Sequence, residues 1–262
     1  MTADAMLDNP IANDANTQTM AIILAAGRGS RMQSDRPKVL LLALGRPLVA
    51  HVIDALITAG IQKIVLVVGY QQELVKIELK EYANLTFVTQ QEQLGTGHAV
   101  QMCEAQLKQH SGPVIVVTGD SPLVQPQSLK ALLAKFQAIQ ASCILGSLHH
   151  ADPTGLGRIV RDGQGNFTGI VEQKDATAQQ ENITEVNMST YVFDSSHLQW
   201  SLEKLQSNNA QSEYYLTDCP SILKQAGHVV EALPVLKSCE SLSVNTLEQL
   251  QLVEQEMQQL GY

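Results

Sequence analysis

The sequence predicts an α/β fold in which helices cover both faces of a mixed, mainly parallel β-sheet. Three observations predict it. Short apolar runs alternate with helical stretches from Met20 to about residue 140. Runs such as Ile64–Val68 and Val114–Val117 are apolar at every position, as expected for strands buried on both faces of a parallel sheet. After residue 140, closely spaced strand patterns and the turn residues 162–165 (Asp-Gly-Gln-Gly) indicate an antiparallel insert.

The elements are expected in the following order. Residues 1–19 lack periodicity and are expected to form a flexible tail, and residues 20–262 a single domain. Its first part, about 20–140, is expected to hold strands at 21–24, 63–68, 85–88 and 113–118 and helices at 47–59, 71–81, 97–107 and 128–138. Its second part, about 141–240, is expected to hold strands at 142–148, 157–161, 167–172, 185–193 and 229–235 and a helix at 198–205.

A closing helix is expected at about 246–260. Apolar residues recur there every three or four positions, at Leu247, Leu250, Val253, Met257 and Leu260. Thr246 and Gln249 have the spacing of a capping box, which marks the start of a helix.

Composition and charge exclude several classes of protein. Of 262 residues, 44% are hydrophobic and 16% charged, which is typical of a globular chain with a sizeable core and excludes disorder for most of it. The net charge of −9 argues against nucleic acid or an anionic membrane as a partner. No apolar run reaches the roughly 18 residues of a membrane span, and the first twenty residues do not resemble a secretory signal. We therefore expect a cytoplasmic protein.

A glycine-rich turn follows the first predicted strand, at residues 24–32 (Leu-Ala-Ala-Gly-Arg-Gly-Ser-Arg-Met). Small residues there let the backbone approach a ligand, and successive amides can surround a phosphate. The pattern is neither a Walker loop nor the dinucleotide fingerprint. Arg31 and Lys38 add positive charge, which favours a small-anion site over the alternative of an ordinary turn with solvated bases.

Two further segments follow predicted strands. Gln90 and Gln93 carry amides that suit the edge of a pyrimidine, although they also suit a solvated loop. Asp120 follows the strand at 113–118 and suits Mg²⁺, although it could instead cap a turn before Pro122. The four cysteines have no metal-binding spacing and are expected to be reduced.

Several segments together resemble one enzyme family. They are residues 24–32 with Pro37-Lys38, residues 90–99 (Gln-Gln-Glu-Gln-Leu-Gly-Thr-Gly-His-Ala), residues 152–159, residues 169–176 and residues 208–218. They resemble sugar-1-phosphate nucleotidyltransferases, most closely the uridyltransferase half of the bacterial bifunctional N-acetylglucosamine-1-phosphate uridyltransferase/glucosamine-1-phosphate acetyltransferases. The resemblance covers roughly residues 20–250.

The resemblance implies a Rossmann-like, three-layer nucleotidyltransferase domain with an antiparallel sugar-binding insert. It implies Mg²⁺-dependent transfer of a uridylyl group from UTP to N-acetylglucosamine-1-phosphate, with release of pyrophosphate. By resemblance, the catalytic residues are Arg31 and Lys38, and the metal ligands are Asp120 and Asn245, although Asn245 could also cap the last helix. The nucleotide-binding residues are Leu24, Ala26, Gly27, Gly29, Gln90, Gln93, Gly95 and Thr96. The sugar-binding residues are Gly157, Glu172, Asn187, Tyr215 and Thr217. Ranked second to these, Arg158 and Lys174 could neutralise a phosphate or simply pair with nearby acids.

The sequence departs from the family pattern at two places. Asn187-Met188-Ser189 replaces the usual Asn-Thr-Gly, and Thr118 replaces an aromatic residue before Gly119-Asp120. Two alternatives therefore stay open: the same chemistry on another sugar-1-phosphate or pyrimidine nucleotide, or a non-catalytic sugar-nucleotide-binding protein. No hexapeptide repeats follow residue 250, so we expect the acetyltransferase half to be absent. No oligomeric state follows from the sequence.

Overall fold

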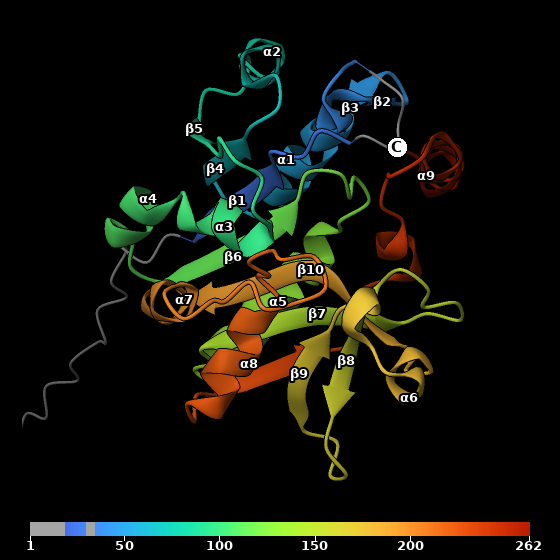
Figure 1. Cartoon of the computed structure of the whole chain (residues 1–262). Helices are drawn as coiled ribbons and strands as arrows, with labels where there is room; N and C mark the ends of the chain where they lie inside the picture. The colour runs from blue at the N-terminus through green and yellow to red at the C-terminus, as the bar shows by residue number, and fades with distance from the viewer. Residues whose placement is uncertain (1–18, 30–34) are drawn as a thin grey trace, which may run out of the picture.

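The computed structural model describes residues 19–29 and 35–262. Within these residues, nine strands form one sheet whose main path runs β11-β7-β10-β6-β1-β4-β5 (Figure 1). The parallel part comprises β1 (Met20–Ala25), β4 (Lys63–Val68), β5 (Leu85–Thr89) and β6 (Pro113–Thr118). The predicted α/β class with a mainly parallel sheet is therefore confirmed.

The second part of the sheet contains the antiparallel pairs. β10 (Glu185–Asp194) lies antiparallel between β6 and β7 (Cys143–His149), and β11 (Val230–Leu233) pairs with β7 in parallel. The hairpin of β8 (Gly157–Arg161) and β9 (Phe167–Val171) pairs with β10 through β8, off the main path (Figure 1). This is the predicted antiparallel insert.

Helices cover both faces of the sheet, because side chains of each buried strand alternate between the two faces. One face packs against α1 (Leu48–Thr58), α2 (Gln72–Glu78) and α5 (Pro126–Ala138). The other packs against α3 (Thr96–Gln101), α4 (Glu104–Lys108), α7 (Ser195–Leu202) and α8 (Asp218–Gln225). The result is the predicted three-layer arrangement.

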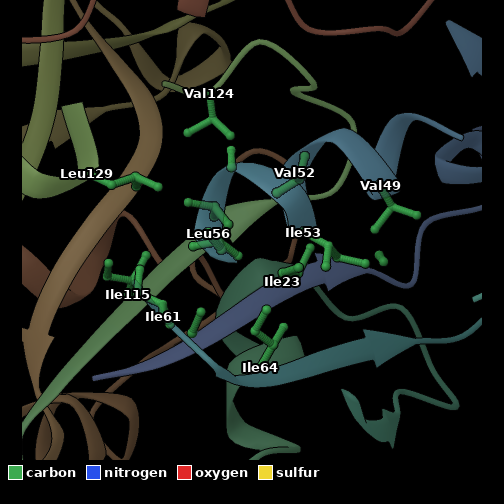
Figure 2. Close-up of a cluster of buried hydrophobic side chains, with 14 of the residues drawn as sticks. Ile23, Val49, Val52, Ile53, Leu56, Ile61, Ile64, Ile115, Val124 and Leu129 are labelled. Atoms are coloured by element: carbon green, nitrogen blue, oxygen red, sulfur yellow. The ribbon is translucent and has the colours of Figure 1, made fainter. Parts of the chain in front are cut away.

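Helix α1 illustrates how the layers are held together. Its apolar residues at positions 49, 52, 53 and 56 follow the spacing of one helix face and are fully buried. Figure 2 shows these side chains around Ile23 of β1, Ile64 of β4 and Ile115 of β6. Each fully buried aliphatic side chain stabilises the fold by about 1.5–3 kcal/mol before entropy is counted, so this face anchors the parallel strands.

Two further elements bring residues from distant parts of the chain to one end of the sheet. The short 3-10 helix η2 (Lys38–Leu40) buries Val39 and Leu40 and thereby places Lys38. Helix α9 (Leu247–Leu260) buries Val253 and Met257 in a third apolar cluster with Ala43 of the small hairpin β2 (Leu42–Ala43) and β3 (Arg46–Pro47). The predicted capping box of Thr246 and Gln249 is present at its start.

Some helices differ from the expected ones. The single helix expected at 97–107 is two short helices, α3 and α4, which meet at Met102 and Cys103. Helix α5 begins two residues early, at Pro126, because proline is tolerated in the first turn. Helix α8 was not predicted, since Pro220 lies within it and its apolar face spans only two turns. The remaining short elements are η3 (Gln173–Asp175), α6 (Ala178–Glu181) and η4 (Ser238–Ser241).

A search for membrane-spanning helices, restricted to the residues that the structure describes, finds none of sufficient length and apolar character.

Candidate active site

The chain segments that follow β1, β4, β5 and β6 meet at one end of the sheet, as the carboxyl ends of parallel strands must. The segments after β1, β5 and β6 line a first cavity of about 240 Å³. Nine of the predicted site residues line it: Leu24, Ala26, Gly27, Lys38, Gln90, Gln93, Gly95, Thr96 and Asp120. The structure thus brings together residues that the sequence spreads over almost a hundred positions.

Lys38 connects two residues predicted to bind metal. Its ammonium group donates to a carboxylate oxygen of Asp120 and to the side-chain oxygen of Asn245, the latter at 3.0 Å. Side-chain exposure is only 15% for Lys38 and 18% for Asp120, so water screens this ion pair less than a surface pair. The two oxygens therefore converge on one position, which the lysine nitrogen occupies.

The backbone holds this cluster from both sides. Val244 donates its backbone N–H to the carbonyl of Asp120 at 3.0 Å, which joins the loop after β6 to the segment before α9. Asn245 donates its backbone N–H to the side chain of Gln249 at 2.7 Å, so the start of the last helix sets its position. The cap of α9 is Thr246, whose side chain accepts from the N–H of Gln249. Asn245 therefore contributes only its backbone N–H to the start of this helix, and its side-chain oxygen accepts from Lys38.

Gly29, predicted to bind nucleotide, packs against Lys38 and is not among the residues that line the first cavity. Its φ of +68° favours glycine, and a β-carbon at this position would lie 2.6 Å from Cβ of Lys38. The glycine therefore makes room for the lysine stem. Arg31, the other predicted catalytic residue, lies outside the described residues.

The segment after β5 is held mainly by its own polar groups. The buried side chain of Gln90 donates to the carbonyl of Gly95 at 3.1 Å, and its nitrogen lies 3.0 Å from Nδ1 of His98. Gln93 donates to the carbonyl of Gln90 at 3.1 Å. Both glutamine amides thus shape the loop that lines the first cavity.

This loop is also tied to the segment that precedes α8. Gly97 donates its backbone N–H to the carbonyl of Tyr214 at 2.7 Å, and Tyr214 donates to the carbonyl of Leu94 at 2.8 Å. The N–H of Leu216 donates to the hydroxyl of Thr96 at 3.0 Å. Gly95 has a φ of +111°, and a β-carbon there would lie 2.6 Å from the carbonyl oxygen of Tyr214, so only glycine allows this approach.

Two more cavities continue from the first. The second, of about 180 Å³, shares Thr118 and Asp120 with the first and is lined by the predicted sugar-binding residues Gly157, Glu172 and Asn187. The third, of about 320 Å³, shares Glu172 with the second and is lined by Tyr215 and Thr217. The three cavities are therefore neighbours in a row, with Asp120 between the first and second and Glu172 between the second and third.

The third cavity is rich in carboxylates. Burial raises the pKa of Glu172, although the hydroxyl of Thr217, which donates to it at 3.0 Å, acts in the opposite direction. Burial and the nearby charge of Asp175 likewise raise the pKa of Asp218. With three acids around it, this end of the row disfavours a phosphate, whereas the Lys38 end favours one.

The unusual Asn187-Met188-Ser189 segment lies at a bulge in β10, against the second cavity. The Met188 side chain packs in the main apolar cluster and is 8% exposed. Ser189 adopts a φ of +53°, a conformation that favours glycine, the residue usual in the family pattern.

The second-ranked phosphate ligands have partners other than the acids considered in the sequence. Arg158 is 1% exposed and donates to the carbonyl of Leu156 and to the side chain of Gln173. Lys174 donates to the side chain of Gln211 at 2.7 Å. Arg158 therefore joins the segment before β8 to the segment after β9, within the insert.

Several cavity residues were not predicted. They are Glu213 in the first cavity, Ser121 and Ser243 in the second, and Asp175 and Asp218 in the third. Three of them, Asp175, Glu213 and Asp218, belong to the segments that carry the family resemblance, which was the available signal. Among the residues described, no group of three or more His, Cys, Asp and Glu side chains is arranged to hold a metal ion.

Comparison with known proteins adds the following findings. A family model described as nucleotidyl transferase matches residues 20–235. The bifunctional protein GlmU of Exiguobacterium sp. (strain ATCC BAA-1283 / AT1b) is 45% identical over 228 residues, which cover 87% of this chain and 50% of that protein. The chain thus spans about half the length of the curated relatives it matches.

Solved structures share the fold. A Bacillus anthracis protein in complex with sucrose has a TM-score of 0.77 at 19% identity, over 93% of this chain and 97% of that one. A UDP-glucose pyrophosphorylase complexed with UDP-glucose has a TM-score of 0.74 at 17% identity, over 92% of this chain and 99% of that one.

Proposed function

Because this chain belongs to the nucleotidyl transferase family, we propose that it transfers the uridylyl group of UTP to N-acetylglucosamine-1-phosphate and releases pyrophosphate. The observation that carries this proposal is the row of three neighbouring cavities with the Lys38–Asp120–Asn245 cluster beside the boundary between the first two. The identity of 42–45% to bifunctional GlmU proteins, which spans half of their length, supports the choice of this reaction within the family.

Charge suggests how the substrates lie. The nucleotide is assigned to the first cavity, where small residues allow close approach and Gln90 and Gln93 shape the wall. The sugar is assigned to the second and third cavities. The acids of the third cavity would repel a phosphate, so the sugar-1-phosphate lies with its phosphate toward Lys38 and its hydroxyls toward Glu172.

The reaction requires no general base. The attacking group is a phosphate monoester, which is already an anion near neutral pH because its second pKa is about 6. The protein must hold two anionic substrates in line and neutralise the charge that develops on the α-phosphate and on pyrophosphate. Lys38 supplies a positive charge in the first cavity, beside Asp120, where the phosphates of the two substrates would meet. Arg31 is assigned the same task from the resemblance.

Asp120 and Asn245 fit a bound Mg²⁺ ion. Their side-chain oxygens converge on a single nitrogen atom, so they can also converge on one cation. One carboxylate and one amide oxygen are the hard, sparse ligand set that Mg²⁺ uses when phosphates and water complete its shell. When bound there, the ion would neutralise charge on the phosphates.

The deciding experiment measures pyrophosphate release from UTP, N-acetylglucosamine-1-phosphate and Mg²⁺. Release by the wild type and its loss in Asp120→Ala are expected, while Glu104→Ala, which breaks an exposed ion pair with Lys108, serves as the matched control. Pyrophosphate release only with another sugar-1-phosphate or pyrimidine nucleotide would favour the alternative of the same chemistry on other substrates. Ser189 and Thr118, which depart from the family pattern and line the cavities, support this alternative. Binding of UDP-sugars without pyrophosphate release from any sugar-1-phosphate and nucleotide tested would favour a non-catalytic sugar-nucleotide-binding protein.

A further inference from the structure

The bulge in β10 brings together two residues that a regular strand would keep apart. Asn187 lies opposite Ser147 of β7, and Tyr191 lies opposite Leu145, so four residue steps on β10 match only two on β7. In an undistorted strand, residues four positions apart are separated by about 14 Å. The bulge, with Ser189 in the left-handed region, shortens this path.

As a result, Tyr191 contacts the side chain of Asn187. The amide nitrogen of Asn187 donates to the hydroxyl of Tyr191 at 2.7 Å, and the N–H of Ser189 donates to the amide oxygen of Asn187 at 3.3 Å. An amide held at both its nitrogen and its oxygen has one orientation. Its second N–H and its second lone pair remain available, and Asn187 lines the second cavity.

Tyr191 is itself held rigidly. It is 1% exposed, and its ring stacks on Phe193 with ring centres 5.6 Å apart. Burial raises the pKa of its hydroxyl above the ordinary value, and the nearby Glu172 acts in the same direction, so the phenol stays neutral near neutral pH. Because this hydroxyl is buried, uncharged and well packed, it stays in one position, and the amide that donates to it is held in one orientation.

We propose that Tyr191 is a positioning residue, whose hydroxyl holds the Asn187 amide in the orientation that binds the sugar-1-phosphate. Tyr191 is not among the residues that line any of the three cavities, so it acts through Asn187. This inference rests on the proposed function, because it assigns the sugar to the second cavity.

Kinetics of Tyr191→Phe test the inference, since this change removes only the hydroxyl. The KM for the sugar-1-phosphate is expected to rise about tenfold, while kcat and the KM for UTP stay within about twofold of the wild type. Tyr82→Phe is the matched control, because the Tyr82 hydroxyl donates to Asp54, which lines none of the three cavities, whereas the partner of Tyr191 lines the second.

A double-mutant cycle separates positioning from general stability. If Tyr191 acts through Asn187, the KM of Tyr191→Phe/Asn187→Ala equals that of Asn187→Ala alone. If the role of Tyr191 were purely structural, the two substitutions would change KM by independent factors that multiply. Alternatively, Tyr191→Phe would lower the melting temperature without changing KM.

A spectroscopic measurement tests the contact without relying on activity. The side-chain amide signal of Asn187 is identified by its loss from the ¹⁵N spectrum of Asn187→Ala. It should shift in Tyr191→Phe and stay in place in Tyr82→Phe. An unchanged signal in Tyr191→Phe overturns the inference, whether or not the protein turns over substrate. Absence of turnover in the wild type with a shifted signal overturns the proposed function alone.

Discussion

The ammonium group of Lys38 lies against the carboxylate of Asp120, although the two residues are 82 positions apart. The 3-10 helix η2 carries the lysine, and the loop after β6 carries the carboxylate. Asp120 lines both of the first two cavities, whereas Lys38 lines the first, so the pair lies beside the boundary between them. Several predictions depend on this contact.

Replacing Lys38 with methionine is expected to reduce turnover by about a hundredfold or more, because a preorganised charge beside the reacting phosphates is lost while the side-chain length is kept. Steady-state rates of pyrophosphate release measure the effect. Lys108→Met is the control, since Lys108 forms an exposed ion pair with Glu104 on α4, away from the three cavities. Near-normal turnover in Lys38→Met would contradict the assignment.

Lys38→Met is also expected to bind a divalent cation more tightly than the wild type when no substrate is present. The lysine nitrogen occupies the position on which the oxygens of Asp120 and Asn245 converge, so it competes with a cation for both. Titration with Mn²⁺, followed by its paramagnetic resonance signal, measures the affinity directly. Asp120→Asn should weaken binding. Equal affinity in Lys38→Met and the wild type would show that the two do not compete.

The change Gly29→Ala is expected to lower kcat about tenfold or more, because the new β-carbon would displace the stem of Lys38, which lies 2.6 Å away. Gly45→Ala is the matched control. Gly45 has a similar φ of +78° but no atom within 4 Å of its β-carbon position, so it carries the backbone strain without the collision. Comparable losses of kcat in both variants would assign the effect to strain alone.

The change Glu172→Gln is expected to raise the melting temperature at pH 7–8 relative to the wild type. Burial raises the pKa of Glu172 in the folded chain, so ionisation at neutral pH opposes folding. This penalty is absent below the ordinary carboxyl pKa, and it develops as the pH rises through the raised value. The gain from glutamine should therefore vanish near pH 4. A gain of equal size at every pH would assign it to a cause other than charge.

The change Ser189→Gly is expected to leave the fold at least as stable, because it relieves a φ of +53°, whereas Ser189→Val is expected to destabilise it by about 1–2 kcal/mol. Denaturant unfolding of the variants measures both effects. Ser189→Ala keeps the β-carbon and removes the hydroxyl, so it separates the backbone contribution from the side-chain contribution. If glycine were less stable than alanine, the strain argument would be wrong.

The sequence predicted the parallel strands well, because a run such as Val114–Val117 has no other stable place than the middle of a sheet. It also predicted that Asp120 follows a parallel strand, and in the structure Asp120 lines the first cavity together with residues of the loop at 90–96. The roles assigned to these residues remain predictions from the family resemblance.

Other features depend on contacts that local patterns do not carry. The convergence of Asp120 and Asn245 on Lys38 requires η2, β6 and α9 to be packed together first. The bulge in β10 places Ser189 in a conformation that favours glycine. This chain has serine there, and only the family pattern, with glycine at that position, pointed to the conformation; nothing in the sequence indicated the contact of Tyr191 with Asn187.

The hydrogen bonds that join residues 94–97 to residues 214–216 connect the wall of the first cavity to the segment that carries Tyr215 and Thr217 into the third. If the cavities hold the two substrates as proposed, these short bonds join the two binding positions directly. A substitution that breaks them is then expected to change the affinity for both substrates, not for one alone.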